Sequence, residues 1–291
     1  MSDLKAKKLE KLRALQAEDR RKKGLPHLFG FPFYPWARRF FDSTNPWNFL
    51  VGGNQVSKSS TMIRKAIHWA TASELWPDLW RTKPNVFWYL YPSVDVADIE
   101  VRKKWIPEFL PRNEFKDDPK YGWELIEERG KVTGIDFKSG VTIYFKAYTQ
   151  NAQVLQTGTV FAHFVDEELP MELFPELQFR LLATTGYYHA AFTATLGQDY
   201  WRQVMEDKSK DRPFPKALKI TVSLYDCMFY EDGSPSFWTK EKIENAIASC
   251  PNQRVVDMRI YGKFVKAEGL RYPSFDRLKN VKKPTEPIPA D

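Results

Sequence analysis

Cysteine is scarce in this sequence, with only Cys227 and Cys250 among 291 residues. The two are not spaced as CxxC, and no cluster of histidines accompanies them, which argues against both a disulfide framework and a zinc site. Long apolar runs are also missing. No stretch approaches the roughly 20 residues that span a bilayer, and the amino terminus is charged rather than signal-like. We therefore expect a chain without membrane segments that works in a reducing cytoplasm.

The positive charge is unevenly distributed. The formal net charge is +7, yet residues 1–23 hold nine Lys or Arg against four Asp or Glu, so a net of +5 lies in this short stretch. Residues 4–23 predict a charged helix that ends at Gly24. A solvated arm and a contact with nucleic acid or protein are equally compatible with this pattern. Net charge alone does not establish DNA binding.

The remainder of the chain predicts a packed α/β domain. Hydrophobic residues make up 43% of the sequence and aromatic residues 15%, which is ample for a core. Expected strands alternate with expected helices, and this alternation predicts a mainly parallel sheet flanked by helices on both faces. A hairpin is expected around Lys138-Ser139-Gly140. The strands are expected at residues 48–51, 85–91, 160–165, 188–195 and 218–224, and the main helices at 96–110, 172–182, 199–207, 239–249 and 252–261.

A phosphate-binding loop is predicted at residues 52–59, Gly-Gly-Asn-Gln-Val-Ser-Lys-Ser. It matches G-x-x-x-x-G-K-[ST] except at Ser57, which stands where glycine is usual, and it lies between an apolar strand and an amphipathic helix. Such a loop cradles phosphate oxygens with backbone N–H groups at a helix N-terminus. Lys58 would reach the β- and γ-phosphates of ATP, and Ser59 would bind Mg²⁺. The alternative is a Gly-Gly turn before a capped helix. The residues expected to contact the nucleotide are Gly53, Asn54, Gln55, Val56, Ser57, Lys58, Ser59 and Ser60.

A second apolar stretch ends directly in the acids Asp166, Glu167 and Glu168. ATP hydrolysis needs a metal holder and a group that positions and deprotonates water. Asp166 is expected to serve the metal and Glu167 the water, since neighbouring side chains at a strand end point to opposite sides. The alternative is a cluster that caps the following helix, and Glu168 is expected to act only in that way.

Three stretches of this sequence together resemble the ATPase domain of the large terminase subunit of tailed bacteriophages. They are FLVGGNQVSKSS, FAHFVDEELPMELFPELQFRLLATTGYYHAAFTAT and RIYGKFVKAEGLRYPSFD, in the order of that family. The resemblance implies a P-loop NTPase of the additional-strand-catalytic-glutamate class. It also implies an ATP- and Mg²⁺-dependent motor that drives double-stranded DNA into a procapsid in the host cell cytoplasm.

The resemblance assigns roles residue by residue. It places the Mg²⁺-binding aspartate at Asp166, the catalytic glutamate at Glu167 and the coupling motif at Thr193-Ala194-Thr195. A threonine hydroxyl beside the γ-phosphate would sense hydrolysis when that phosphate is lost. The alternative is that Thr193 and Thr195 merely favour a strand.

This sequence departs from the family pattern at two places. Relatives can carry an arginine inside the phosphate loop or shortly before the acidic strand, where this chain has Asn54 and Gln156. Arg180 is then the candidate catalytic arginine, acting on its own site or on that of a neighbouring subunit; a helix-surface role is the alternative. For the adenine base, Tyr34 or Trp36 is the candidate stacking partner.

The resemblance also predicts the organisation of the chain and its partners. Residues 1–25 are expected to form a charged arm, 26–265 the ATPase domain with a C-terminal helical lid, and 266–291 a linker toward a nuclease domain that the chain lacks. No DNA cleavage is expected. The implied partners are double-stranded DNA, portal protein, the small terminase subunit and copies of the chain in a ring, with a monomer in solution left open. A helicase-like P-loop ATPase and a nucleotide-gated scaffold are the alternatives.

Overall fold

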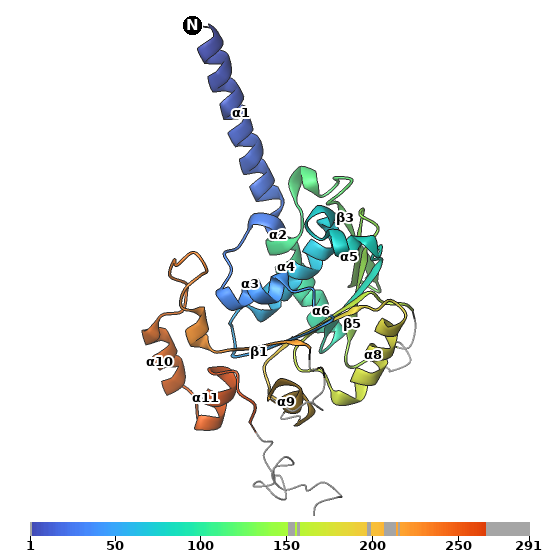
Figure 1. Cartoon of the computed structure of the whole chain (residues 1–291), viewed down its shortest axis with the longest axis vertical. Coiled ribbons are helices and arrows are strands. Elements are labelled where there is room, and N and C mark those ends of the chain that lie inside the picture. The colour runs from blue at the N-terminus through green and yellow to red at the C-terminus, as the bar shows by residue number, and fades with distance from the viewer. Residues whose placement is uncertain are drawn as a thin grey trace, which may run out of the picture.

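A computed structural model describes residues 2–150, 155, 158–196, 199–206, 214 and 216–265 (Figure 1). The helices are α1 (Ser2–Gly24), α2 (Pro26–Phe29), α3 (Pro35–Asp42), α4 (Lys58–Thr71), α5 (Pro77–Arg81), α6 (Val94–Glu100), the π-helix η2 (Val101–Phe109), α8 (Phe174–Leu182), α9 (Asp199–Glu206), α10 (Lys240–Ala248) and α11 (Gln253–Arg259). The strands are β1 (Trp47–Gly52), β2 (Val86–Tyr91), β3 (Trp123–Glu128), β4 (Lys131–Phe137), β5 (Thr142–Ala147), β6 (Ala162–Asp166), β7 (Tyr187–Phe192) and β8 (Leu218–Val222). None of the described helices is both long enough and apolar enough to cross a membrane.

The eight strands form one sheet in the order β3-β4-β5-β2-β6-β7-β1-β8. The strands β5, β2, β6, β7, β1 and β8 run parallel to one another, whereas β4 pairs antiparallel with β5 and β3 antiparallel with β4. The predicted mainly parallel sheet is therefore confirmed. Strand β7 lies between β1, which leads into the phosphate loop, and β6, which ends in the acids. This inserted strand is the feature after which the additional-strand class is named.

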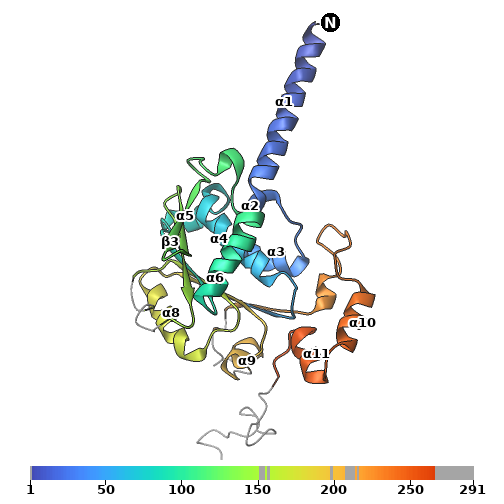
Figure 2. The same cartoon turned by 180° about the vertical axis from the view of Figure 1, so that it is seen from behind.

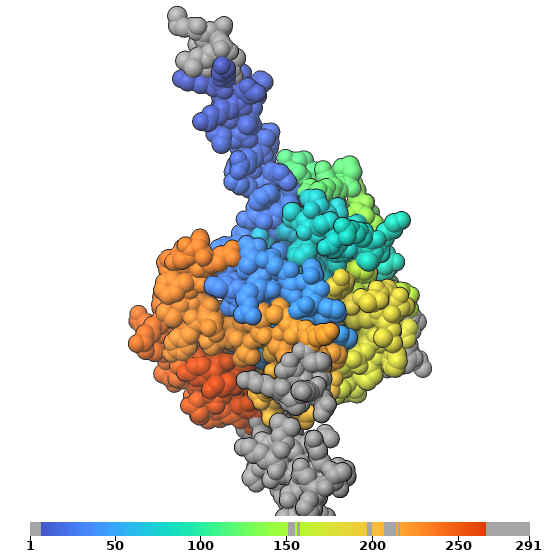
Figure 3. All heavy atoms as spheres, in the orientation of Figure 1, coloured from blue at the N-terminus to red at the C-terminus, as the bar shows by residue number. Residues whose placement is uncertain are grey.

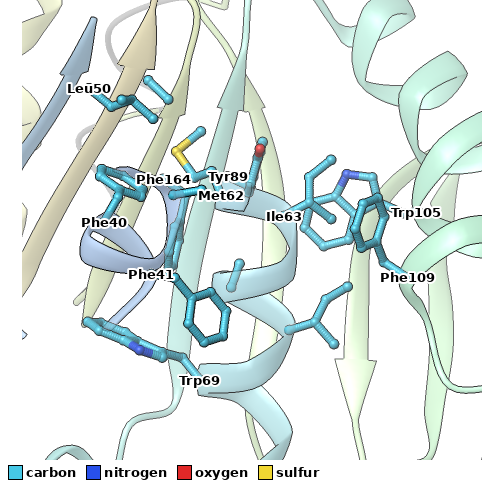
Figure 4. Packing of buried hydrophobic residues seen from close by; sticks show 14 of the residues in the cluster. Phe40, Phe41, Leu50, Met62, Ile63, Trp69, Tyr89, Trp105, Phe109 and Phe164 are labelled. Atoms are coloured by element: carbon cyan, nitrogen blue, oxygen red, sulfur yellow. The ribbon is translucent and has the colours of Figure 1, made fainter. Parts of the chain in front are cut away.

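Both faces of the sheet are covered by helices, as the alternation of strands and helices predicted. On one face α3, α4 and η2 pack against the strands, and Figure 4 shows Phe40 and Trp69 among the large side chains gathered there. The other face carries α8 and α9, whose Phe174 and Trp201 pack over β1 and β7. Figure 2 shows from behind that α10 and α11 lie together beside the body. Successive residues of a buried strand face opposite clusters, which explains why these strands are apolar throughout.

Helix α1 extends away from the body as an arm (Figures 1 and 3). Residues 7–23 are exposed along it. Its base is fixed where the N–H of Arg112 donates to the carbonyl of Gly24 at 2.9 Å. A Cβ at Gly24 would lie only 2.3 Å from the ring of Phe115, so the close contact requires glycine. Because the exposed helix buries little of its own surface, its stability rests on helix propensity and pairs such as Lys22 with Glu18.

Three features differ from the sequence-based expectations. Strand β3 was not expected, because its sequence WELIEE is polar at the sheet edge. The helix expected at 96–110 is α-helical only to Glu100 and continues as a π-helix that contains Pro107. Strand β7 ends at Phe192, so Thr193 and Thr195 lie in the loop beyond it rather than in the strand. Gln156 and the expected linker at 266–291 lie outside the described residues.

Candidate active site

The ends of three adjacent parallel strands bring the predicted site residues together. Strands β6, β7 and β1 are neighbours, and their register pairs Asp166 with Ala191 and Val51 with Phe192. Their carboxyl ends therefore meet at one edge of the sheet, which is where open α/β sheets bind ligands. The phosphate loop follows β1, the acids follow β6, and Thr193 follows β7.

A cavity of about 370 Å³ lies at this edge. Residues 54–60 of the phosphate loop form one side of it. Glu167, Thr193 and Thr195 line it from the neighbouring strand ends, and Lys104 of η2 completes the wall. Of the eight loop residues expected to contact a nucleotide, seven line the cavity. Gly53 lies behind them, and its N–H donates to the carbonyl of Val222 at 3.1 Å.

Lys58 is buried at the base of the loop. Its Nζ donates to the carbonyls of Gly52 and Gly53, at 3.1 and 2.6 Å, and to Oγ1 of Thr193 at 3.0 Å. Burial lowers the pKa of the Lys58 ammonium, while the carboxylates of Glu167 and Asp166 act in the opposite direction. The lysine thus connects the phosphate loop directly to the residue after β7.

The backbone conformation of the loop shows why glycine is usual at the position that Ser57 occupies. Ser57 has a φ of +67° and Gln55 a φ of +57°, both in the left-handed region. Glycine is usual at the position of Ser57 because only glycine adopts this conformation without steric cost. Gly53 is required for a different reason, since a Cβ there would lie 2.4 Å from the carbonyl oxygen of Arg259. That carbonyl also accepts a hydrogen bond of 2.8 Å from the N–H of Asn54, so the end of α11 supports the loop.

The carboxylate of Asp166 is buried and held from both sides. Ser59 Oγ donates to Oδ1 at 2.8 Å, and the hydroxyl of Tyr89 donates to Oδ2 at 2.9 Å. Burial raises the pKa of Asp166 to about 6, and the nearby Glu167 adds to the rise, while the hydrogen bonds from Ser59 and Tyr89 oppose it. A nearby cation would favour the charged form. The site therefore presents a carboxylate that is positioned in advance for a positively charged ligand.

Glu167 differs from Asp166 in that its side chain is exposed to the cavity. Its φ of +75° turns the chain out of β6, and its N–H is held by the carbonyl of Ala191 at 3.0 Å. The hydroxyl of Tyr148 donates to its carbonyl at 3.1 Å. Left-handed backbone at a residue other than glycine costs free energy, and such strain concentrates at functional sites.

Glu168 does not act as the expected helix cap. The cap position of α8 is Leu173, with the turn at 171–173 in between. Instead the buried carboxylate of Glu168 accepts a hydrogen bond of 2.6 Å from the N–H of Leu196. This contact ties the loop after β6 to the loop after β7. The sequence position of Glu168 shortly before the helix did not predict a cap, because the chain makes the turn at 171–173 before α8 begins.

Arg180 is not brought to this cavity. Helix α8 begins near the acids and runs back along the sheet, and the turn that follows it contacts the start of β6, where Thr184 Oγ1 donates to the carbonyl of Val160 at 2.7 Å. Arg180 is two residues from the end of α8, and β6 has five residues, so roughly 17 Å of strand separates the two edges. Helix direction thus places Arg180 at the edge of the sheet opposite the cavity, and its catalytic role stays a prediction for the site of a neighbouring subunit.

A second cavity of about 140 Å³ adjoins the phosphate loop. Its walls include Phe33, Tyr34, Arg64 and Tyr230, and it shares Ser57 and Ser60 with the first cavity. Tyr34 is stacked on Tyr230 with ring centroids 4.9 Å apart. Of the two aromatic candidates for the adenine base, Tyr34 lines this cavity, whereas Trp36 is not among the residues that line it.

Three functional contacts were not predicted from the sequence. Tyr89 donates to the carboxylate of Asp166, Tyr148 donates to the carbonyl of Glu167, and Lys104 lines the phosphate cavity from a helix 46 residues beyond Lys58. The side of the sheet that Tyr89 faces could have been predicted, because side chains alternate between the two faces along the strand NVFWYLY. The position of Lys104 depends on the π-helical geometry, which no sequence pattern indicated.

The residues of the site fit a magnesium ion bound together with a nucleotide. Ser59 and Asp166 present a hydroxyl and a carboxylate oxygen within 2.8 Å of each other. Mg²⁺ prefers oxygen ligands and is commonly held by one or two protein groups together with substrate phosphates. Within the described part of the chain, no group of three or more His, Cys, Asp and Glu side chains forms a metal site. A metal here would therefore rely on the nucleotide for several of its ligands.

The sheet, the loop and the acidic strand end define a P-loop NTPase fold. No family model matches the sequence, and no curated protein matches it. Solved structures that share its fold include the large terminase ATPase domain of Thermus phage P74-26 and a point mutant of that domain. The first superposes with a TM-score of 0.52 over 81% of this chain and 95% of its own, at 12% identity. The mutant gives 0.53, with 81% and 96% coverage at the same identity. This chain thus has the fold of a large terminase ATPase domain, and at such identity the likeness establishes the fold alone.

Proposed function

We propose that this chain is the ATPase motor of a viral DNA-packaging machine, which couples hydrolysis of ATP to movement of double-stranded DNA into a procapsid. One observation carries the proposal: a single cavity collects Lys58, Glu167 and Thr193 from three adjacent strand ends. It does so in a chain that has the fold of a terminase ATPase domain.

The phosphate loop binds the nucleotide. Its N–H groups and the N-terminus of α4 provide partial positive charge for phosphate oxygens. Lys58 exchanges the loop carbonyls and Thr193 for the β- and γ-phosphates, because a charge-assisted bond to an anion is stronger than a bond to a neutral oxygen. Ser59 and Asp166 hold Mg²⁺, which when bound neutralises charge on the phosphate oxygens.

Glu167 acts on the attacking water. Its carboxylate faces the cavity, whereas that of Asp166 is buried beside Ser59. The exposed acid is therefore free to orient water and accept its proton, while the buried acid keeps its place beside the metal. Two adjacent carboxylates with different surroundings thus take two different roles.

Thr193 links the state of the nucleotide to the chain beyond the site. Its Oγ1 accepts a hydrogen bond from Lys58 at 3.0 Å and lies 3.4 Å from Oδ1 of Asn54. When the γ-phosphate leaves, Lys58 returns to Thr193, and this exchange displaces the loop at 193–196. Leu196 in turn bonds Glu168, and Leu169 accepts a bond of 2.9 Å from Trp201 of α9. Hydrolysis is thereby transmitted to the face of the sheet that carries α8 and α9.

The proposed partners are double-stranded DNA, portal protein, the small terminase subunit and copies of this chain in a ring in the host cytoplasm. A steady-state phosphate-release assay with no DNA, single-stranded DNA or double-stranded DNA tests the proposal. We expect slow hydrolysis that double-stranded DNA and portal accelerate. Stronger stimulation by single strands would favour a helicase-like ATPase instead, and nucleotide binding without turnover in every condition would favour a scaffold.

A further inference from the structure

Two cationic side chains line the phosphate cavity in the described part of the chain, Lys58 and Lys104. Lys58 comes from the phosphate loop, where its ammonium already has three hydrogen-bond partners. Lys104 comes from η2, on a separate wall of the cavity. ATP hydrolysis develops charge on the transferring phosphoryl group, and a second cation besides the loop lysine is usual there. Relatives can carry an arginine inside the phosphate loop for this purpose, whereas this chain has the neutral Asn54 there.

The helix that carries Lys104 is anchored to the strand that holds Asp166 in place. The adjacent Trp105 is fully buried, and its Nε1–H donates to the hydroxyl of Tyr91 at 2.8 Å. The Trp105 ring also packs edge-on against Tyr89 at 4.9 Å, and Tyr89 is the side chain that donates to Asp166. The backbone of Lys104 is therefore held in a fixed place relative to the buried carboxylate.

The π-helix contributes one residue to each of the two adjoining cavities. Its hydrogen bonds run from i to i+5, as between the N–H of Leu110 and the carbonyl of Trp105 at 2.8 Å, so residues five apart lie on nearly the same side. Lys104 lines the phosphate cavity, and Phe109, five residues later, lines the apolar cavity beside it. Regular α-helical spacing would turn these two side chains apart, and π-helical segments occur frequently at functional sites.

The ammonium of Lys104 has little competing engagement. Among the described residues, the carboxylate it meets as an ion pair is that of Glu100, with Nζ and Oε2 4.0 Å apart, at the limit of such a contact. The side chain is 26% exposed, so it is largely sheltered. The neighbouring Lys103 is exposed instead and does not line the cavity.

We propose that Lys104 is a further catalytic residue of the proposed ATPase, whose ammonium contacts the γ-phosphate and stabilises its charge in the same subunit. The inference rests on the proposed function. In the reaction, the water oxygen forms a bond to the γ-phosphorus, and the bond to the bridging oxygen breaks with its electron pair leaving on ADP. Glu167 takes the proton of the water. Lys104 stays protonated throughout and supplies only charge.

The test compares Lys104→Met with Lys104→Arg and with the matched control Lys103→Met. Hydrolysis is measured in a single turnover with protein in excess, and the binding of ADP and of a non-hydrolysable ATP analogue is measured separately. We expect Lys104→Met to lose on the order of 10²–10³ in rate, the usual loss when one donor to a developing charge is removed. Its affinity for ADP should stay within about threefold of wild type, since ADP lacks the γ-phosphate. Lys104→Arg should recover at least part of the rate, and Lys103→Met should match wild type.

A wild-type rate in Lys104→Met would overturn the role of Lys104. If Lys58→Ala lost nucleotide binding in the same experiment, the proposed ATPase would still stand. Absence of hydrolysis in the wild-type chain with every nucleic acid and with portal would instead defeat the proposed function itself. Far-UV circular dichroism and ADP binding report whether Lys104→Met folds; if it does not, Lys104→Gln replaces it and the same rate loss is expected.

Discussion

The hydroxyl of Ser59 donates a hydrogen bond of 2.8 Å to the carboxylate of Asp166, 107 residues further along the chain. The bond joins the first turn of α4 to the end of β6. It fixes the distance between the phosphate loop and the acids before any ligand binds. Preorganisation of this kind removes part of the entropy cost of ordering a site. The relationship supports the proposal that these two residues share one metal ion.

Lys58→Ala should abolish tight nucleotide binding. Each charge-assisted hydrogen bond contributes roughly 1.5–3 kcal/mol, and the lysine is proposed to contact two phosphates. We expect the dissociation constant for Mg²⁺-ATP to rise at least about 100-fold, measured by isothermal titration calorimetry. Lys65 of the same helix is buried and bonded to backbone carbonyls of the segment before β1, so its loss should instead act on folding. Unchanged binding in Lys58→Ala would show that the loop is wrongly assigned.

Ser57→Gly should stabilise the protein. At a φ of +67° a residue with a Cβ destabilises the folded state by roughly 1–2 kcal/mol, and glycine removes this cost. Part of the gain is lost, because glycine also has greater freedom in the unfolded chain. We expect the free energy of unfolding to rise by about 0.5–1 kcal/mol in denaturant titrations, with no gain for the control Ser57→Ala. A faster or tighter ATPase in the glycine variant would mean that Ser57 restrains the loop. Loss of folding would instead reveal a packing role for Ser57.

Arg180→Ala should leave the dilute chain unchanged in rate, because Arg180 lies at the opposite edge of the sheet from the cavity. The remaining form of the arginine hypothesis is action on a neighbouring subunit. Mixing Arg180→Ala with Glu167→Gln protein on portal and DNA would then restore part of the hydrolysis, since each variant lacks what the other supplies. No rescue, together with a rate per subunit that is independent of concentration, would leave Arg180 as a surface residue.

Acid should destabilise the fold through its histidines. All four are buried, and burial lowers the pKa of each, to about 3 for His68 and His163. Below about pH 6.5 the unfolded chain binds protons that the folded chain does not, so stability falls as the pH falls from 6.5 toward 3. Each such histidine contributes up to about 1.4 kcal/mol per pH unit in this range.

The check is the free energy of unfolding at pH 7 and pH 5 for wild type and His163→Gln. The imidazole of His163 lies 3.0 Å from the carbonyl of Leu177, to which neutral Nε2–H donates. The variant should be less stable at pH 7 but lose less stability on acidification. Equal stability of the wild type at both pH values would contradict the claim that the histidines are buried and neutral in the folded protein.

Much of the fold could be predicted because its strands are buried on both faces. Continuous apolar stretches such as residues 85–91 identify such strands, and the glycine-rich loop after β1 marks a phosphate site. The antiparallel edge was harder. The glutamates at 124, 127 and 128 are as typical of an exposed loop as of an edge strand. This segment forms strand β3 because it pairs with β4.

The parts of the site that were missed depend on tertiary geometry. Lys104 lines the cavity from a helix that changes to π geometry after Glu100, a change that the sequence did not predict. The position of Arg180 at the opposite edge of the sheet could not be predicted, because the sequence does not show which edge the end of a helix approaches until the strand order is known. Glu168 was misread because its partner, the N–H of Leu196, is 28 residues away.

The most direct test of the central claim is the fate of ATP in Glu167→Gln. Glutamine keeps the size and hydrogen bonding of the side chain but cannot accept a proton. We expect the variant to bind Mg²⁺-ATP as tightly as wild type and to hydrolyse it more slowly in a single turnover by roughly 10²–10⁴-fold, as when a general base is lost. Asp166→Asn should differ by weakening the Mg²⁺ dependence of binding. Hydrolysis by Glu167→Gln at the wild-type rate would contradict the role of Glu167 as the general base.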